Sequence, residues 1–318
     1  MYEADTVLIA MYGATIGATS ILKINACTNQ ACAAIKKNEQ VIPEYLYYFL
    51  RSKKKKFVKD GVGGAQPNIS AGYLKKVEME LPSIEDQRVI VDILEKISDI
   101  VIKRKQEIQS LDNLIKARFV EMFGDITIND KNWKYEPLGE LCTIVRGGSP
   151  RPIEQFLGGD VPWIKIGDAT DGDSVYLRST KEYIIQEGVK KSRLVKEGSL
   201  IFANCGVSLG FARIITFDGC IHDGWLAMED IDERLDKVFL LQALNQMTEH
   251  FRAIAPAGTQ PNLNTAIMKA YKQVIPPIEL QREFISFAKQ VDKSKVAVQK
   301  ALDETQLLFD SLMQKYFG

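Results

Sequence analysis

The sequence contains the same unit twice, and this internal repeat constrains the fold more than any other feature. The pentapeptide Gly-Ala-Gln-Pro-Asn at 64–68 recurs as Gly-Thr-Gln-Pro-Asn at 258–262, which is 194 residues later. Leu-Pro followed by Glu and Gln-Arg at 81–88 recurs at the same offset, as Ile-Pro followed by Glu and Gln-Arg at 275–282. Several short matches in one order and at one offset indicate a duplicated structural unit.

The first copy lacks the beginning of the unit. Val7–Ala10 matches Leu200–Ala203 at an offset of 193, so residue 1 aligns near Leu194. Roughly residues 125–193 therefore have no counterpart in the first copy. We expect one full unit and the last two-thirds of another. We also expect residues 1–83 alone to expose strand edges and apolar surface that the absent part would cover.

The composition is that of a globular protein. At 318 residues, with 46% hydrophobic and 26% charged residues, two domains are expected. No apolar run approaches the roughly 18 residues of a membrane span, and no signal peptide is visible, which predicts a cytoplasmic protein without membrane contact. The five cysteines form no CxxC pair and only two histidines are present. We therefore expect reduced thiols, no metal site and no cofactor.

The charge is balanced over the chain but not within it. Lys and Arg together number 41, as do Asp and Glu. Residues 1–83 carry 11 basic and 7 acidic side chains, whereas residues 125–277 carry 17 basic and 20 acidic ones. Because neutralised phosphates supply most sequence-independent affinity for nucleic acid, the chain alone should bind DNA weakly. A role on DNA requires a clustered basic face or a basic partner.

Each copy ends in a predicted long helix. The first begins after Pro82, with Ser83 as N-cap and acidic residues in its first turn. Apolar residues then recur in alternating steps of four and three over about five heptads, which is typical of a coiled coil. The residues predicted to form the seam are Leu94, Ile97, Val101, Ile108, Leu111 and Ile115 in the first helix and Val291, Val298, Leu302, Phe309 and Leu312 in the second.

Two similar helices separated by a domain can bury their seams against each other. If the two copies are related by a two-fold axis, the helices form an antiparallel coiled coil. Each helix would be about 50–60 Å long at 1.5 Å per residue. The alternative is that each helix packs only on the domain that precedes it.

The segment before each helix reads as a β-rich domain. Pro and Gly punctuate short apolar runs, which predicts strands joined by tight turns. One helix is expected over Pro43–Val58 and its counterpart over Val238–Ile254. The fold class is therefore α+β, with β-rich domains joined by two long helices. The predicted strands are Val7–Tyr12, Val77–Leu81, Val161–Ile166, Leu200–Ala203 and Phe211–Phe217.

This pattern resembles the specificity subunit of type I restriction-modification systems. The residues that carry the resemblance are Pro82, Glu85, Gln87 and Arg88, their counterparts Pro276, Glu279, Gln281 and Arg282, both Gln-Pro-Asn motifs, and Val161-Pro162-Trp163-Ile164 leading to Gly167-Asp168. The likeness covers the whole chain, except that the first domain lacks its first ~70 residues, which puts recognition by that domain in doubt.

The resemblance implies a scaffold that reads DNA without catalytic residues. It implies that each β-rich domain is a target recognition domain for one half of a bipartite site in double-stranded DNA. The helices would act as a spacer, and their rod would bind DNA adenine methyltransferase subunits, with restriction subunits joining the complex. The predicted divisions are a partial recognition domain at 1–83, a spacer helix at 84–124, a second recognition domain at 125–277 and a second spacer helix at 278–318.

Two features of the sequence have both a structural and a DNA-binding interpretation. Gln66 and Gln260, in the Gln-Pro-Asn motifs, suit adenine in the major groove. The motif is also a turn in which Asn68 or Asn262 caps a short helix, and its presence in both copies favours this structural role. The run Lys53, Lys54, Lys55 and Lys56 either contacts phosphates or is a solvated end of a helix.

The best candidates for base contacts are polar residues on loops where the copies differ. Thr15 and Ser208 occupy matching tight loops, where a small hydroxyl approaches a DNA backbone easily. Trp163, between Val161 and Ile164, is predicted to be a core residue. The further candidate DNA contacts are Arg146 and Arg151, which flank a Gly-Gly turn, and Lys181, Lys190, Lys191, Ser192 and Arg193, which form a basic stretch.

The sequence contains none of the usual catalytic motifs. It has no phosphate-binding Gly-x-x-x-x-Gly-Lys-Ser/Thr, no Gly-x-Ser-x-Gly and no His-Glu-x-x-His. An enzyme is therefore not expected. The competing hypothesis is an assembly protein or recombination donor that does not read DNA. Such a protein would use its coiled coil to bind methyltransferase, a second copy of the chain, or a chain that completes the first domain.

Overall fold

A computed structural model describes residues 1–62, 68–170, 173–206, 208–256 and 261–318. The chain forms two compact units. The first unit contains Met1–Ser110 and Ser294–Gly318, and the second contains Leu111–Lys293. In the described residues no helix is long and apolar enough to cross a membrane.

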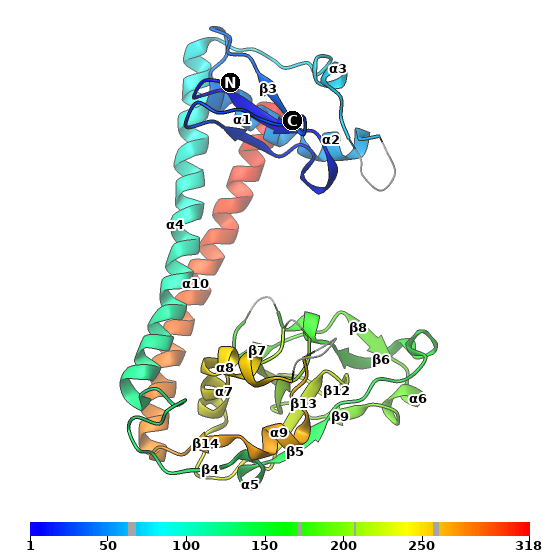
Figure 1. The fold of residues 1–318 in the computed structure, drawn as a ribbon, viewed down its shortest axis with the longest axis vertical. Coiled ribbons are helices and arrows are strands. Elements are labelled where there is room, and N and C mark those ends of the chain that lie inside the picture. Colours follow the sequence, from blue (N-terminus) through cyan, green and yellow to red (C-terminus); the bar gives the residue numbers. More distant parts are fainter. Residues whose placement is uncertain (63–67, 171–172, 207, 257–260) are drawn as a thin grey trace. The chain divides into compact units, whose positions relative to one another are not determined.

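The first unit is built on a three-stranded antiparallel sheet with the order β2-β1-β3 (Figure 1). Helix α1 starts with Pro at its first position and buries Tyr45, Tyr48 and Phe49, which lie on one helical face against β1 and β2. The elements are β1 (Val7–Ala10), η1 (Gly13–Thr15), β2 (Thr19–Ile21), β3 (Cys32–Ile35), α1 (Pro43–Ser52), α2 (Lys54–Asp60) and α3 (Ala71–Leu74).

The second unit contains a five-stranded sheet with the order β5-β13-β10-β11-β7 and a four-stranded sheet with the order β8-β6-β12-β9. Strands β14 and β4 form a separate pair. The strands are β4 (Tyr135–Pro137), β5 (Thr143–Arg146), β6 (Leu157–Ile164), β7 (Tyr176–Leu177), β8 (Glu182–Ile184), β9 (Arg193–Val195), β10 (Leu200–Ala203), β11 (Ala212–Ile215), β12 (Gly219–Ile221), β13 (Trp225–Glu229) and β14 (Lys272–Val274).

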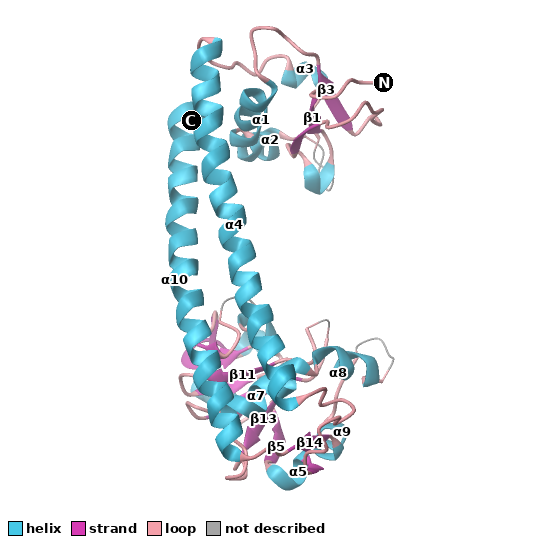
Figure 2. Ribbon diagram, turned by 90° about the vertical axis from the view of Figure 1, so that its left-hand side faces the viewer, coloured by secondary structure: helices cyan, strands magenta, loops and turns pink. Residues whose placement is uncertain are grey.

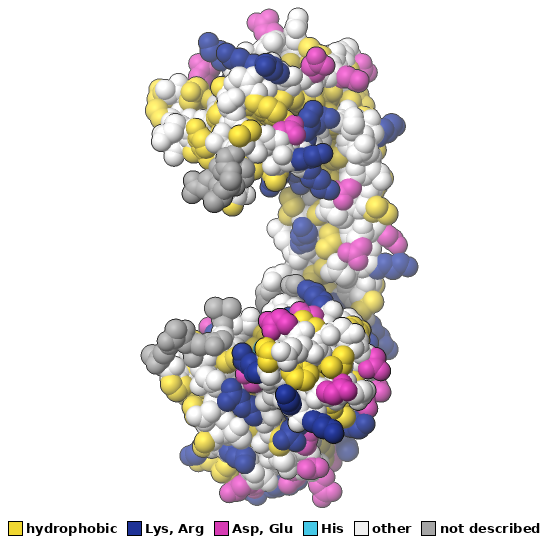
Figure 3. All heavy atoms as spheres, turned by 90° about the vertical axis from the view of Figure 1, so that its right-hand side faces the viewer, with side chains coloured by type: hydrophobic (Ala, Val, Ile, Leu, Met, Phe, Trp, Pro, Cys, Tyr) yellow, Lys and Arg dark blue, Asp and Glu magenta, His cyan; other side chains and the backbone are white. Residues whose placement is uncertain are grey.

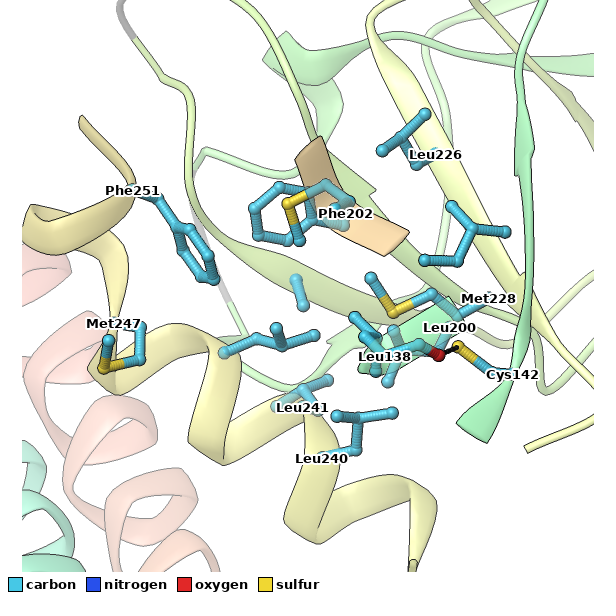
Figure 4. Close-up of a cluster of buried hydrophobic side chains, with 14 of the residues drawn as sticks. Leu138, Cys142, Leu200, Phe202, Leu226, Met228, Leu240, Leu241, Met247 and Phe251 are labelled. Carbon is cyan, nitrogen blue, oxygen red and sulfur yellow. Dashed lines mark hydrogen bonds between the residues drawn. The ribbon is translucent and has the colours of Figure 1, made fainter. Parts of the chain in front are cut away.

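Helices cover one face of the five-stranded sheet and enclose the core of the second unit. Leu138, from α5, lies beside Leu200 of β10 in this core, with Leu240 and Leu241 of α7 next to them (Figure 4). The helical elements are α5 (Leu138–Leu141), η2 (Ile153–Gln155), η3 (Ile166–Asp168), α6 (Gln186–Val189), α7 (Lys237–Gln246), α8 (Thr248–Ile254) and α9 (Thr265–Ala270).

The sheet of the first unit repeats the centre of the five-stranded sheet. Val7 pairs with Ile35 between β1 and β3, and the residues 193 positions later, Leu200 and Met228, pair between β10 and β13. On the other side of the central strand, β2 pairs with β1 in the first unit, and its counterpart β11 pairs with β10 in the second unit. The outer strands β5 and β7 belong to the region that has no counterpart in the first copy.

The two long helices are α4 (Ile84–Phe123) and α10 (Ile278–Phe317), each of 40 residues. In the first unit, Leu94 of α4 shares a core with Phe309 and Met313 near the end of α10. In the second unit, Phe119 near the end of α4 shares a core with Phe284 near the start of α10. The helices are therefore antiparallel, as Figures 1 and 2 also show, and the predicted coiled coil is confirmed.

The predicted seam residues all lie inside the described part of both helices, and none of them is exposed. Leu94, Val101, Ile115, Val291, Leu302 and Phe309 are buried, and Ile97, Ile108, Leu111, Val298 and Leu312 are half-buried. The end of each helix also packs on the other copy's domain. The rings of Phe317 and Tyr45 are 5.1 Å apart, and those of Phe123 and Phe239 are 4.8 Å apart. Packing of each helix only on its preceding domain is therefore wrong.

The Gln-Arg junction at the start of each long helix has a structural role. Gln87 is fully buried, accepts a hydrogen bond from the Ile42 N–H at 2.9 Å, and lies 2.8 Å from the Gln40 carbonyl and 3.0 Å from the Pro82 carbonyl. Its side chain thus ties the first turn of α4 to the segment that enters α1. This hydrogen bonding explains why glutamine is needed at the junction.

Several sequence-based predictions differ from the structure. The helix expected over Pro43–Val58 is two helices, because Lys53 leaves the helical conformation between α1 and α2. The same break separates α7 from α8, within the helix expected over Val238–Ile254. Strand Leu200–Ala203 has the predicted bounds, whereas those of Val7–Tyr12, Val161–Ile166 and Phe211–Phe217 differ by one to several residues.

The predicted strand Val77–Leu81 is wrong. Its counterpart in the second copy is β14, which pairs with β4 at Tyr135–Pro137. Residues 135–137 belong to the region without a counterpart in the first copy. Because a strand forms only where a partner strand accepts its hydrogen bonds, Val77–Leu81 joins no sheet.

The helix caps after the Gln-Pro-Asn motifs also differ from the prediction. Ser70 caps α3 by accepting a hydrogen bond from the Tyr73 N–H, and Asn264 caps α9 by accepting one from the Ile267 N–H. Asn68 and Asn262 are therefore not the caps. They form isolated β-bridges with Tyr12 and Cys205, respectively, at equivalent positions in the two copies.

Candidate nucleic-acid interface

Two loops of the second unit lie against each other at one end of its sheets. The first, residues 146–151, follows β5, and the second, residues 222–224, joins β12 to β13. The Gly147 N–H donates to the Trp225 carbonyl at 2.9 Å, and the Gly148 N–H donates to the Ile221 carbonyl at 3.0 Å. A Cβ atom on Gly147 would lie 2.2 Å from the His222 carbonyl oxygen, so only glycine permits this approach. We call residues 146–151 and 222–224 the two-loop surface.

Asp223 holds the two-loop surface together. The Ser149 hydroxyl donates to its carboxylate at 2.7 Å, and an Nη2 of Arg151 lies 3.6 Å from the same carboxylate. The Nε of Arg146 donates to the Asp223 backbone carbonyl at 3.1 Å. Burial raises the pKa of Asp223, but the Ser149 hydrogen bond, His222 and the two arginines outweigh it, so this pKa is lowered. Asp223 is therefore ionised at neutral pH, its carboxylate pairs with Arg151, and its backbone carbonyl positions Arg146.

The predicted basic stretch adjoins the first loop. The Ser192 hydroxyl donates to the Gly148 carbonyl at 2.7 Å, so this hydroxyl is engaged in fixing the loop. On either side of it, Lys191 and Arg193 are exposed. The Lys191 ammonium lies 4.6 Å from the centre of the Phe156 ring, and Arg193 begins β9. Through the hydrogen bond between Ser192 and Gly148, the structure brings this stretch against the loop that carries Arg146 and Arg151, from which it is far apart in sequence.

The indole of Trp163 lies near the imidazole of His222 in the two-loop surface. The ring centres of His222 and Trp163 are 6.2 Å apart, and Lys165, which forms an ion pair with Glu182, lies 5.7 Å from the Trp163 ring centre. Trp163 is 5% exposed, which confirms the prediction that it belongs to the core.

His222 is held in its neutral form. Burial lowers the pKa of His222 most, and the nearby Lys165 and Arg151 lower it further, against the opposing effect of Asp223. Its Nδ1 accepts a hydrogen bond from the Gly224 N–H at 2.8 Å. The neutral ring therefore has its other nitrogen, Nε2, available as a donor.

Asn262, the last residue of the Gln-Pro-Asn motif in the second copy, bonds to a residue next to the two-loop surface. The side chain of Asn204, fully buried at the end of β10, donates from Nδ2 to the Asn262 Oδ1 at 3.2 Å. Its backbone N–H donates to the Gly224 carbonyl at 2.9 Å. Cys205 follows, and burial and the charge of Asp223 raise the pKa of its thiol against the opposing effect of Arg146. Gln66 and Gln260 lie outside the described residues.

The remaining candidate DNA contacts lie elsewhere. Lys181 and Lys190 are exposed, and the Lys181 N–H donates to Asp168 at 3.3 Å. Thr15 is exposed and Ser208 is half-buried, in equivalent loops that follow Gly13 and Gly206, both at positive φ. The Thr15 hydroxyl donates to the Tyr12 carbonyl at 3.2 Å.

The lysine run lies at the junction of α1 and α2 rather than at a helix end. Lys53 donates from Nζ to the carbonyl of Phe317, the last residue of α10, and lies 5.5 Å from the Phe49 ring centre. Its charge therefore satisfies the C-terminal end of a helix. Lys54, Lys55 and Lys56 are exposed on α2.

His222, Asp223, Ser149 and Lys165 were not among the candidates from sequence. The two loops are separated by about 75 positions, and only the strand pairing β13–β5 brings them together. The one available signal was the polar triplet His-Asp-Gly between two apolar strands.

The arrangement suits binding to nucleic acid. Arginine guanidinium groups bind phosphates and the major-groove edge of guanine, and a neutral imidazole can donate to a base edge. Lys and Arg side chains are interspersed with acidic ones on the face of the second unit shown in Figure 3. Among the described residues, no group of three or more His, Cys, Asp or Glu side chains is placed to hold a metal ion.

Comparison with known proteins shows the family. A family model described as "Type I restriction modification DNA specificity domain" matches residues 2–113 and 130–305. The chain belongs to this family and is a DNA-recognition subunit of the type I restriction-modification class. The sequence-based identification is confirmed.

Relatives and solved structures agree. The MjaIX specificity subunit of Methanocaldococcus jannaschii is 25% identical over 99% of this chain and 77% of its own length. The EcoDI specificity subunit of Escherichia coli is 23% identical over 86% of this chain and 69% of its own length. The fold matches a chain from a structure of a type I restriction-modification assembly, with a TM-score of 0.65 and 17% identity over 99% of this chain and 82% of that one. The structure of an S subunit from M. genitalium matches with a TM-score of 0.58 and 18% identity, over 100% of this chain and 84% of that one.

Proposed function

We propose that the second unit reads one half of a bipartite DNA site through the two-loop surface. The observation that carries this proposal is the position of Asp223, whose carboxylate pairs with Arg151 and whose backbone carbonyl accepts from Arg146. The exposed Lys191 and Arg193 lie on either side of Ser192, which bonds to the same loop at Gly148. Residues 125–277 form this recognition domain, residues 1–83 form a partial one, and residues 84–124 and 278–318 are the spacer helices. The chain contributes sequence recognition, and the chemistry belongs to its partners.

The partners proposed are DNA adenine methyltransferase and restriction subunits, as expected for a type I complex. Exposed apolar side chains on the long helices support a docking role. Ile102 is 50% exposed and Val296, its counterpart 194 residues later, is 70% exposed. Leu114 and its counterpart Leu308 are 46% and 51% exposed. Apolar side chains exposed at equivalent positions of two helices suit two copies of one partner.

This docking proposal predicts a specific loss of assembly. Ile102→Asp and Val296→Asp should each remove one of two equivalent methyltransferase sites, and the double variant should remove both. Co-purification with the methyltransferase, followed by mass measurement of the complex, reports the stoichiometry. The matched control is Lys103→Ala, a change at an exposed position beside Ile102. Full assembly of the double variant would contradict this use of the helices.

The recognition proposal is tested by co-expression with the methyltransferase and genome-wide mapping of methylated adenines. Arg146→Ala and Arg151→Ala should each reduce methylation of the target about tenfold or more, because one arginine contact to a base is worth about 1–3 kcal/mol. Arg178→Ala, an exposed arginine of the same unit paired with Asp173, is the control. Unchanged methylation in both loop variants would overturn the proposal.

The mapped motif also distinguishes the ways in which the chain can be used. Two different half-sites indicate that both recognition domains read DNA within one assembly. A symmetric motif indicates two copies of the chain, each using residues 125–277. A single short motif indicates that residues 1–83 do not read DNA. Absence of any defined methylated motif would support the competing hypothesis of an assembly protein that does not read DNA. The match to the DNA specificity family does not favour that hypothesis.

A further inference from the structure

Exposed lysines gather on two short helical segments of the first unit. Four of them lie on α2 and two directly follow α3, and all six side chains are exposed. Within residues 54–60 and 71–76, both of which the structure describes in full, Asp60 is the one acidic residue. We call this set the lysine patch: Lys54, Lys55, Lys56, Lys59, Lys75 and Lys76.

Contacts between α2 and α3 hold the lysine patch together. The Phe57 side chain is fully buried, and its ring centre lies 6.2 Å from that of Tyr73. The Tyr73 hydroxyl donates to the Asp60 carboxylate at 2.6 Å. This hydrogen bond uses the one acid of the two segments to join the two helices. The lysine patch is therefore a fixed part of the fold, and the acid within it is already engaged.

The fold itself does not require lysine at these positions. The second unit builds the same two helices as α8 and α9, and the buried Phe251 takes the place of Phe57. The counterparts of the lysine patch, 194 positions later, are exposed or half-buried, so this surface is open to solvent in the second unit as well. These counterparts are Thr248, Glu249, His250, Ala253, Lys269 and Ala270. The clustered positive charge of the first unit therefore serves a role other than folding.

The lysine patch adjoins a loop whose counterpart lies beside the two-loop surface. A Cβ atom on Gly17, in the loop between β1 and β2, would lie 3.3 Å from Cγ of Lys54, so α2 packs directly on this loop. The counterpart loop of the second unit, between β10 and β11, begins at Asn204. The Asn204 N–H donates to the carbonyl of Gly224 in the two-loop surface at 2.9 Å. In the first unit, the lysines thus lie next to the equivalent end of the sheet.

We infer that the lysine patch binds the phosphate backbone of double-stranded DNA without reading its sequence. Lysine carries a strongly hydrated point charge on a flexible stem, which suits phosphate contacts, and phosphate contacts carry no direct sequence information. Successive phosphates of one duplex can neutralise several clustered lysines at once. The family model of a DNA specificity domain covers these residues, which favours DNA over RNA or a lipid surface. This inference concerns the first unit and does not depend on reading by the two-loop surface.

The test measures binding of the full chain to a fluorescent duplex of arbitrary sequence, by anisotropy at several salt concentrations. The patch variant combines Lys55→Gln, Lys59→Gln, Lys75→Gln and Lys76→Gln, and it keeps Lys54, whose stem packs on the loop. We expect its affinity to fall about tenfold or more at low salt. The slope of log affinity against log salt should decrease by about 0.9 for each lysine that contacts a phosphate.

A charge-matched control separates a local site from a general effect of net charge. It changes four other exposed lysines of the first unit and should lose much less affinity than the patch variant, with Lys23→Gln, Lys36→Gln, Lys37→Gln and Lys96→Gln. A version of the patch variant with arginine in place of glutamine should restore binding, because it restores the charge. Thermal unfolding of all three variants should match that of the wild type, since every altered side chain is exposed.

Equal losses in the patch variant and the charge-matched control would overturn the inference, as would an unchanged affinity of the patch variant. Single-stranded RNA and phosphatidylserine vesicles are compared with the duplex. Tighter patch-dependent binding to either of them would assign the lysines to another partner and would also overturn it. In the complex with methyltransferase, the patch variant should weaken binding to cognate and unrelated duplexes alike and leave the methylated motif unchanged. Failure of the two-loop proposal would appear separately, as unchanged methylation in Arg146→Ala and Arg151→Ala.

Discussion

Gln87 and Gln281, 194 positions apart, make the same three hydrogen bonds. Gln281 accepts from the Asp236 N–H at 2.9 Å and donates from Nε2 to the carbonyls of Arg234 and Pro276, at 2.8 and 2.7 Å. These partners are the counterparts of those of Gln87. Each glutamine ties the start of a long helix to the segment that enters a domain helix. The junction motif is therefore repeated because both domains need the same anchor between the long helix and the segment that enters the domain helix.

Replacing Gln281 should destabilise the second unit. Gln281→Leu keeps the approximate volume but leaves the Asp236 N–H and two carbonyls without their partner, at a cost of about 2–4 kcal/mol. The free energy of unfolding in urea, followed by circular dichroism, measures this loss. Gln299→Leu on the exposed face of α10 is the control, and it should change stability by less than about 0.5 kcal/mol. Equal effects of the two variants would show that the anchor contributes nothing.

Removing an aromatic ring where the helices meet should also be costly. Phe119 lies 4.9 Å from Phe123, 5.3 Å from Phe284 and 5.8 Å from Phe239, measured between ring centres. Phe119→Ala leaves a cavity among these rings and should lower the free energy of unfolding by about 3–5 kcal/mol. Val296→Ala, at a 70% exposed position of α10, is the comparison and should be neutral or slightly stabilising. Thermal unfolding of both variants checks the difference.

The long helices and their seam could be predicted because their signals are local. Heptad spacing and a capped start are contained within 40 consecutive residues, and the repeat supplied each pattern twice. Pairing between distant strands has no such local signal. Val77–Leu81 has the composition of a strand but forms none, since the strand that would pair with it has no counterpart in the first copy.

The two-loop surface was missed in part for the same reason. Arg146 and Arg151 could be selected by residue type, but Asp223 and His222 join them only through the β13–β5 pairing.

Acid should weaken the second unit through a surface network of charges. Arg234 donates to both carboxylate oxygens of Glu136 at 2.9 Å and to Asp232 at 2.8 Å. Hydrogen bonds from Arg234 lower the pKa of Glu136 and of Asp232, each to about 2, with a further contribution from Lys134. Because both values lie below the roughly 4 of an unfolded carboxylate, the stabilisation is complete above about pH 5 and is lost as the pH falls toward 2.

The melting temperature between pH 6 and 2.5 measures this effect. Glu136→Gln should lower the melting temperature at pH 6 and reduce its decrease on acidification, because one of the titrating groups is gone. Glu154→Gln, an exposed carboxylate of the same unit, should leave the pH dependence unchanged. A parallel pH profile for wild type and Glu136→Gln would contradict the assignment of the network.

Asp223 should control specificity more than affinity. The Asp223 carboxylate pairs with Arg151 and accepts from the Ser149 hydroxyl, whereas its backbone carbonyl accepts from Arg146. Asp223→Ala therefore removes a negative charge, releases Arg151 directly and loosens the loop that carries both arginines. In a complex with methyltransferase, we expect tighter binding to DNA of unrelated sequence, because less repulsion opposes phosphate contacts. Binding to the cognate site should gain less or weaken, because arginines that are no longer oriented lose bidentate base contacts.

The ratio of the affinity for the cognate duplex to that for a scrambled duplex, measured by fluorescence anisotropy at one salt concentration, should fall about tenfold. Asp218→Ala removes a carboxylate paired with Lys196 in the same unit and should leave the ratio unchanged. An unchanged ratio for Asp223→Ala would mean that the orientation of the arginines by Asp223 does not determine which sequence is read.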